Sequence, residues 1–204
     1  MSKISRTFAL ELKVFAVRER RTLKFNSMNS SELRPLDILI LLKKITSSGC
    51  SMSYRELSSS LLISLSSISD SLSRSCVAQL VDGNKQRVNV LALEEFLVHG
   101  LRYAFPVKVG RIMRGVPTYI SASPLKEQVS FGTDSYVWPS RFGTMRGQGI
   151  VPLCPTIPQI VEKDEELYQL LVIVEALRIG RVREREIAAS MLHEFIEHYG
   201  KDER

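Results

Sequence analysis

The chain has 204 residues, of which 44% are hydrophobic and 25% are charged, a balance that excludes a disordered or fibrous protein. No apolar run approaches the ~20 residues that a membrane-spanning helix needs. Three cysteines are too few and too scattered for a disulfide framework or a zinc site. We therefore expect a globular, cytoplasmic protein with no metal, no other cofactor and no membrane partner.

The net charge of +6 is distributed unevenly along the chain. Residues 1–27 and residues 101–150 each carry +5, residues 28–100 are neutral, and residues 151–204 carry −4. Basic segments favour an anionic partner such as nucleic acid, and an acidic end indicates a different task.

Residues 1–30 are expected to form a basic, poorly ordered tail. One interpretation is an arm that adds phosphate contacts to a DNA-binding domain. The other is that translation starts at Met28, so that residues 1–27 are an artefact of gene calling.

Residues 31–105 have the periodicity of a helical domain. Pro35 suits the first turn of a first helix, and Ser53 with Glu56 forms the S-x-x-E capping box of a second. Ser64 and Asn89 are positioned to cap a third and a fourth helix. We expect these four helices at residues 35–45, 53–62, 64–80 and 91–103.

The helix expected at 64–80 is rich in serine. Its apolar residues Leu65, Ile68 and Leu72 recur at helical spacing and are expected to face the core. Hydroxyl groups donate to phosphates and base edges, and a helix N-terminus attracts phosphate. The alternative is a solvated serine-rich helix. The side chains left for solvent are Ser66, Ser67, Ser69, Asp70, Ser73 and Arg74.

Residues 52–81 resemble the helix-turn-helix core of bacterial winged-helix regulators of the MarR or ArsR type. The resemblance implies a winged helix-turn-helix domain whose helix 64–80 enters the major groove of double-stranded DNA. Leu62 stands where the family commonly has a turn glycine, and Leu65 where it commonly has a proline. The residues that carry the resemblance are Ser53, Glu56, Leu57, Ser64, Ser66, Ile68, Ser69 and Leu72.

Residues 106–160 are rich in proline and glycine, which favours loops and short strands over long helices. Arginine beside glycine on a flexible loop can reach a phosphate or a minor groove, and the Gly83-Asn84 turn predicts a short wing or an extended link. The alternative is that these arginines pair with the acidic C-terminal helices of this or another subunit. The expected DNA-contacting residues are Ser53, Ser64, Ser66, Ser67, Ser69, Ser73, Arg74, Lys85, Arg87, Arg111 and Arg114.

The hydrophobic spacing and charge of residues 161–204 predict an acidic αα-hairpin. It has two amphipathic helices, at 164–179 and 182–199, joined at Gly180. We expect the hairpin to pack against the first domain or to form a homodimer, since two-fold regulators bind paired half-sites. His193 and His198 are five residues apart, so they do not have the H-E-x-x-H spacing of a zinc site.

These patterns together predict a mainly α fold: a winged helix-turn-helix domain, a Pro/Gly-rich loop and short-strand region, and a C-terminal helical hairpin. We expect a DNA-binding transcription regulator, a repressor rather than an enzyme. Glutamate in place of Ser67 or Arg74 should abolish operator binding without unfolding the chain. The alternative function is an antitoxin-like interaction module that neutralises a partner protein through its C-terminal half and represses its own operon.

Overall fold

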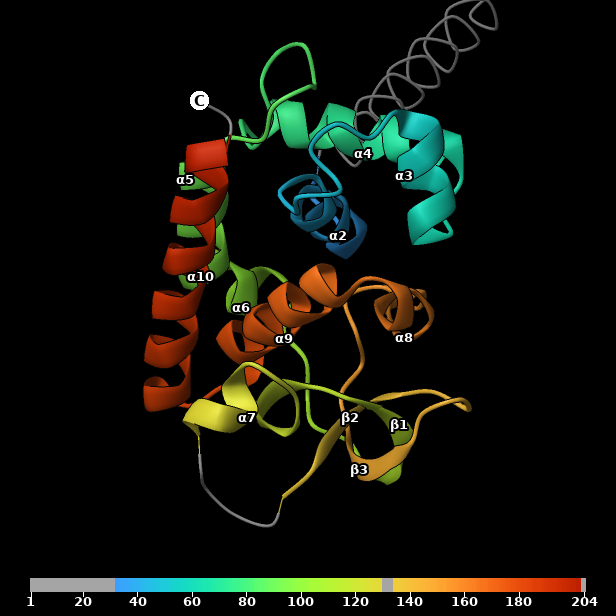
Figure 1. The fold of residues 1–204 in the computed structure, drawn as a ribbon, viewed down its shortest axis with the longest axis vertical. Helices are drawn as coiled ribbons and strands as arrows, with labels where there is room; N and C mark the ends of the chain where they lie inside the picture. Colours follow the sequence, from blue (N-terminus) through green and yellow to red (C-terminus); the bar gives the residue numbers. More distant parts are fainter. Residues whose placement is uncertain (1–31, 130–133, 203–204) are drawn as a thin grey trace, which may run out of the picture. The chain divides into compact units, whose positions relative to one another are not determined.

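The computed structural model describes residues 32–129 and 134–202, with side chains up to His198. The chain divides into two units between Leu33 and Arg34, and of the smaller one only Glu32 and Leu33 are described. The larger unit is mainly helical, with a small three-stranded sheet and a C-terminal pair of helices, as predicted (Figure 1). The expectations for residues 1–30 lie outside the described residues.

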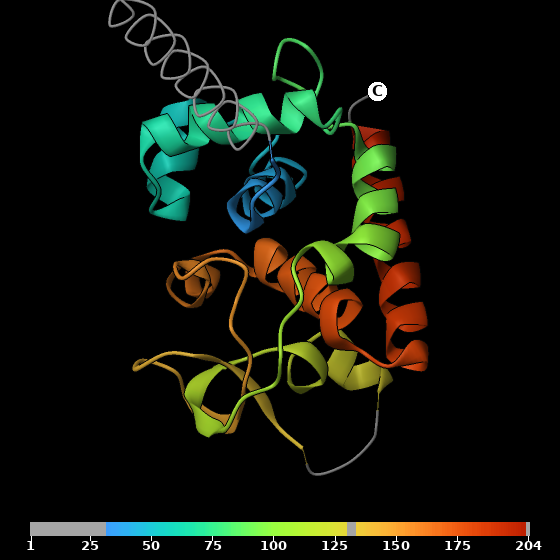
Figure 2. The same cartoon turned by 180° about the vertical axis from the view of Figure 1, so that it is seen from behind.

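Helices α2 (Pro35–Lys44) and α9 (Glu165–Ile179) form the centre of this unit and contact each other. Ile38–Leu42 of α2 and Leu170–Arg178 of α9 are buried at every position. A helix that is apolar on all sides is a core helix. The expectation that α9 is amphipathic is therefore wrong over this stretch, whereas its contact with α2 agrees with the expectation that the hairpin packs against the first domain (Figure 2).

Helices α3 (Tyr54–Leu61) and α4 (Leu65–Val77) pack against each other and against α2. Both predicted caps are confirmed: Ser53 Oγ accepts a hydrogen bond from the Glu56 amide, and Ser64 Oγ accepts one from the Ser67 amide. Leu62 ends α3 in the left-handed conformation, with φ 55°. Leu62 thus adopts the conformation that favours glycine at a helix C-terminus.

The third helix differs from the prediction at both ends. Leu65 is 47% exposed rather than buried. It is the first residue of α4, and the residues of α4 that pack on the core begin at Ile68. The helix stops at Val77 rather than Leu80, because Gln79 takes a positive φ of 61° and the Leu80 amide donates back to the Ser75 carbonyl. This is the Schellman arrangement that terminates many helices.

The fourth predicted helix, 91–103, has a π-helical interruption. It consists of α5 (Val90–Glu95), the π segment η1 (Phe96–Gly100) and α6 (Leu101–Ala104), and Asn89 caps its start as predicted. Leu93, Leu97 and Leu101 are fully buried. The π turn inserts an extra residue into the helix, yet these leucines, four residues apart, all stay on the buried face.

The Pro/Gly-rich region contains the strands β1 (Ile112–Pro117), β2 (Tyr136–Pro139) and β3 (Met145–Gly149). Strand β1 is antiparallel to both others, and β2 pairs with β3 in parallel, so the three strands close on themselves. A Cβ at Gly115 would lie 2.1 Å from the carbonyl oxygen of Trp138, and one at Gly143 would lie 2.0 Å from the Gly115 carbonyl carbon. These glycines permit close backbone packing. The expectation that they lie in flexible loops is wrong at these two positions.

A buried ion pair joins the sheet to the helical core. Trp138 Nε1 donates to Glu175 Oε2 at 2.8 Å, and Arg178 Nη1 donates to Glu175 Oε1 at 3.1 Å. Arg178 also donates to the carbonyl oxygens of Phe105 and Val151. Burial raises the pKa of Glu175 against the opposing influence of Arg178 and Trp138. Glu175 thus attaches Trp138 of the sheet to α9, and Arg178 attaches the backbone at Phe105 and Val151 to the same helix.

Shorter elements and the last helix complete the described part of the chain. Helix α10 (Val182–Asp202) packs against α9, α5 and α7 (Leu125–Gln128). Helix α8 (Ile157–Ile160) packs against α3. No helix within residues 32–129 and 134–202 is long and apolar enough to cross a membrane. The remaining elements are the 3-10 helices η2 (Tyr119–Ser121) and η3 (Val161–Lys163).

Candidate nucleic-acid interface

The outward face of α4 carries three of the six serines expected to contact DNA. Ser66 and Ser69 are exposed, and Ser73 is partly exposed. With Asp70 and Val77 they follow the three- and four-residue spacing of one helix face. The packed face is formed by Ile68, Ser71, Leu72 and Ser75, which are buried against α2 and α3.

The N-terminus of α4 gathers three hydroxyl groups. Ser64 Oγ lies 3.1 Å from Ser66 Oγ and 2.8 Å from Ser67 Oγ. Ser64 and Ser66 are exposed and Ser67 is partly exposed. Hydroxyls and amide groups at a helix N-terminus suit a phosphate oxygen. Ser53 is exposed as well, and its hydroxyl caps α3 as that of Ser64 caps α4.

Arg74 does not face solvent, which contradicts the sequence prediction. Its side chain is 6% exposed, and its Nε donates to Asp37 Oδ2 at 2.9 Å while Nη2 donates to Asp37 Oδ1. This hydrogen bonding raises the pKa of Arg74. Asp37 is fully buried in α2 and also accepts from the Arg34 amide. A buried carboxylate needs a partner, so Asp37 in an apolar helix was the signal that could have identified this pair.

A short turn follows α4 where the sequence predicted a wing. Val81 and Val88 form a single antiparallel bridge, and Asp82 Oδ1 accepts from the amides of Gln86 and Arg87. Lys85 sits at φ 59° and its Nζ donates to Ser73 Oγ at 2.8 Å, so the turn is tied to the outward face of α4. A groove of about 460 Å³ runs between the turn and the end of α4.

The charge on this surface is small. Arg55 of α3 and Arg87 of the turn after α4 are exposed, and Lys85 of that turn is partly exposed. Glu56 of α3 and Asp70 of α4 are also exposed and offset part of this positive charge. Non-specific binding to DNA depends on cations that neutralise phosphates. The α3–α4 surface is therefore suited to hydrogen-bonded contacts more than to strong electrostatic attraction.

Arg111 and Arg114 are exposed but do not lie beside α4. Arg114 is in β1, and its Nε donates to the Gly143 carbonyl oxygen. Both ribbon views place the sheet and α4 at opposite ends of the unit, with α2 and α9 between them (Figures 1 and 2). The structure thus separates the predicted site into two surfaces, with Arg111 and Arg114 at the end opposite α4.

Several acidic groups of the C-terminal segment bind within their own chain. Asp164 Oδ2 lies 2.6 Å from Lys43 Nζ, and the carboxylate of Glu166 accepts from the Ser47 amide at 2.9 and 3.0 Å. Together with the Glu175–Arg178 pair, these contacts attach the acidic segment to the helical core. They account for part of its negative charge without a basic partner protein.

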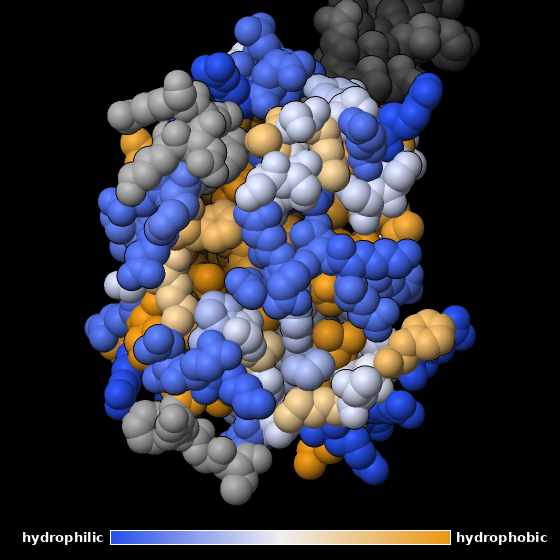
Figure 3. Space-filling model, viewed as in Figure 1, coloured by the Kyte–Doolittle hydropathy of each residue, from blue (hydrophilic) through white to orange (hydrophobic). Residues whose placement is uncertain are grey.

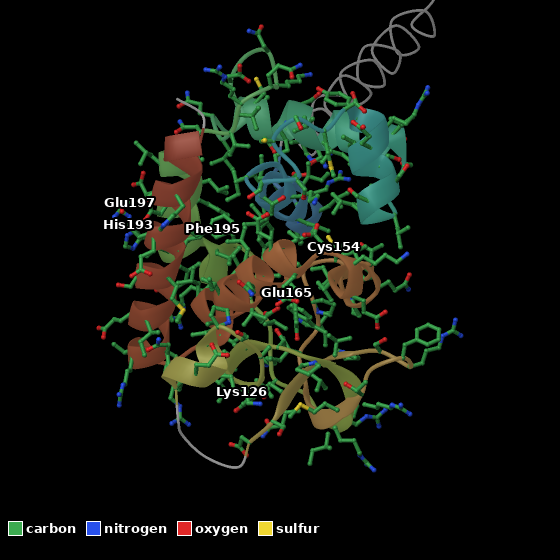
Figure 4. All side chains as sticks on the ribbon, viewed as in Figure 1. Lys126, Cys154, Glu165, His193, Phe195 and Glu197 are labelled. Atoms are coloured by element: carbon green, nitrogen blue, oxygen red, sulfur yellow. The ribbon has the colours of Figure 1, made fainter. Side chains whose placement is uncertain are left out.

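The remaining candidate chemistry is spread over the surface or buried. His193 and Glu197 lie together on α10 (Figure 4), with Nε2 and Oε1 3.5 Å apart, and His193 Nδ1 lies 2.9 Å from Glu94 Oε1. In the part of the chain that the structure describes, no group of three His, Cys, Asp or Glu residues could hold a metal ion. Cys154 is buried, and burial raises the pKa of its thiol to about 12.

The homodimer expected from the C-terminal helices would need a surface other than α9, because α9 is buried within its own subunit. The geometry therefore offers one surface rich in hydroxyl groups on α3 and α4, and a second surface rich in arginine on the sheet. Comparison of the chain with protein-family models, with curated proteins and with solved structures gave no match.

Proposed function

We propose that the protein is a DNA-binding transcription regulator, a repressor, that places α4 in the major groove of double-stranded DNA. The observation that carries the proposal is the exposed serine face of α4. This face lies next to the capped helix α3 and the turn closed by the Val81–Val88 bridge. A helix at the surface that is lined with small hydroxyl residues lets its backbone approach base edges closely.

The contacts of α4 support a positioned rather than a mobile helix. The Asp37–Arg74 pair fixes its inner side to α2, and Lys85 connects its outer side to the following turn. Recognition of base edges needs side chains held in place by a rigid scaffold. Ser66 and Ser69 are the residues we expect to contact bases, and the three hydroxyls at the N-terminus of α4 are expected to contact phosphate.

The weak charge of this surface predicts how binding depends on salt. Among residues 32–129 and 134–202, three cations lie on or next to it, Arg55, Lys85 and Arg87. At about 0.9 per neutralised phosphate, these three cations should contribute about −3 per subunit to the slope of log affinity against log salt. Sequence preference, and not overall affinity, is then the property that identifies the function.

The experiment is a selection with the full chain from a pool of short DNA duplexes of random sequence. The wild-type protein should enrich a defined sequence motif. Ser69→Glu should abolish the enrichment, because it places a second negative charge next to Asp70 on the groove-facing side. Ser190→Glu is the matched control, since Ser190 is an exposed serine on α10 and the charge change is the same.

Circular dichroism should show unchanged folding in both variants, because both serines are exposed. Enrichment of the same motif by Ser69→Glu, or no motif with the wild-type protein, would refute the proposal.

A further inference from the structure

The sheet at the end of the unit opposite α4 has an exposed basic surface, which we call the arginine sheet. None of its basic residues lies within ion-pair distance of a carboxylate in the described ranges. Figure 3 shows hydrophilic residues beside hydrophobic ones at this end of the molecule. The surface is defined by five exposed residues, Lys108, Arg111, Arg114, Arg141 and Arg146.

Two of these arginines are direct cross-strand neighbours. Arg114 of β1 is opposite Arg146 of β3, so their side chains share the outer face of the sheet with Ile112 and Gln148. Like charges directly opposite each other destabilise a sheet. The arrangement therefore becomes favourable when an anion lies between or over the two guanidinium groups.

An aromatic side chain adjoins this charge. Phe142 is 60% exposed in the loop that joins β2 to β3, and the guanidinium carbon of Arg141 lies 4.6 Å from its ring centroid. Figure 1 shows this loop extending beyond the body of the unit. Ile112 is also exposed, on the same strand as Arg114. Phe142 and Ile112 thus add aromatic and apolar surface beside the arginines.

We propose that the arginine sheet binds a single-stranded polynucleotide, with its phosphates on Arg114 and Arg146 and an unpaired base stacked on Phe142. Cations that track a backbone, combined with an aromatic platform, are the features that single-strand binding needs. A duplex keeps its base faces covered, so it cannot use Phe142. An acidic peptide offers carboxylates but no planar base to stack.

This proposal does not rest on the function proposed for α4, because the two surfaces share no residue and lie at opposite ends of the unit (Figures 1 and 2). The test is fluorescence anisotropy of the full chain with labelled oligo-dT and oligo-U, and with a duplex of random sequence as comparison. The two single strands separate DNA from RNA as the source of the polynucleotide. Tighter binding of either one supports the proposal.

Four variants locate the binding surface. Phe142→Ala should weaken binding of the single strand about tenfold, whereas Phe142→Tyr should retain it, because tyrosine keeps a stacking ring. The double variant Arg114→Glu/Arg146→Glu should reduce the salt slope by about 1.4, which corresponds to two lost phosphate contacts. Lys126→Glu is the control for a charge reversal: Lys126 is exposed on α7 and lies off the sheet (Figure 4).

The α4 variant Ser69→Glu separates the two proposals. It should bind the single strands like the wild-type protein even if it has lost its duplex motif. In the Ser69→Glu variant, binding of the duplex that equals binding of the single strands would overturn the proposal, and so would the absence of any effect of Phe142→Ala. Competition by poly-glutamate at equal charge concentration would overturn it as well, because it would show a surface that attracts any polyanion.

Discussion

Replacement of Arg74 by methionine tests the most consequential difference between the sequence prediction and the structure. Arg74 is 6% exposed and Asp37 is fully buried, so the substitution leaves a carboxylate in the core with only the Arg34 amide as partner. Removing one partner of a buried ion pair costs about 3–5 kcal/mol. The free energy of unfolding of a domain is about 5–15 kcal/mol, so the loss is a large share of the total.

Urea denaturation followed by circular dichroism measures this loss. With a slope of about 2 kcal/mol per M urea, a loss of about 4 kcal/mol lowers the midpoint by about 2 M. The slope itself should not change, since the surface exposed on unfolding is nearly the same. Arg74→Glu should be more severe, because it buries two carboxylates side by side, so loss of DNA binding by that variant would report unfolding.

The double variant Asp37→Leu/Arg74→Met is the control. Apolar residues of similar volume often replace a buried ion pair without loss of stability. The double variant should therefore return to within about 1 kcal/mol of the wild-type protein, the residual being the hydrogen bond to the Arg34 amide. A cost below about 1 kcal/mol for Arg74→Met alone would refute the assignment of Arg74 to the core.

Two further predictions concern the sheet and α10. Gly115→Ala should destabilise the unit strongly in the same urea assay, because the added Cβ would lie 2.1 Å from a carbonyl oxygen of the neighbouring strand; a stable alanine variant would contradict the closed packing of the three strands. Hydrogen bonding to Glu94 raises the pKa of His193 above its ordinary value of 6.5, so the stabilisation from this pair is present in full below pH 6.5 and is lost as the pH rises through the raised pKa. Glu94→Gln should return the pKa of His193 towards 6.5 in an NMR titration, and an unchanged pKa would show that the contact does not persist in solution.

The local features of the helical region were predictable from the sequence because they depend on residues close together in the chain. The capping hydroxyls of Ser53 and Ser64 bond to amides three residues away, and Asn89 does the same for Ala92. Hydrophobic spacing predicted the longer helices but not α7 and α8, and proline and glycine content indicated the short strands. None of these inferences requires knowledge of a distant contact.

The orientation of individual side chains depended on distant partners. Periodicity alone assigned Arg74 to solvent, and Asp37, thirty-seven residues earlier, determines that it faces the core. Similarly, the glycines of the Pro/Gly-rich region resembled loop residues until the pairing of β1 with β2 and β3 showed that no side chain fits there.

The sequence by itself determined that this chain forms capped helices, a serine-rich helix with an exposed face and short strands carrying arginine. Only the tertiary structure decided that α9 lies in the core and that the serine face and the arginine sheet are at opposite ends of one unit (Figure 1). The physical reason is that caps and periodicity report interactions over three or four residues. Burial and the relative placement of two surfaces are set by contacts between residues far apart in the chain, which a local pattern does not encode.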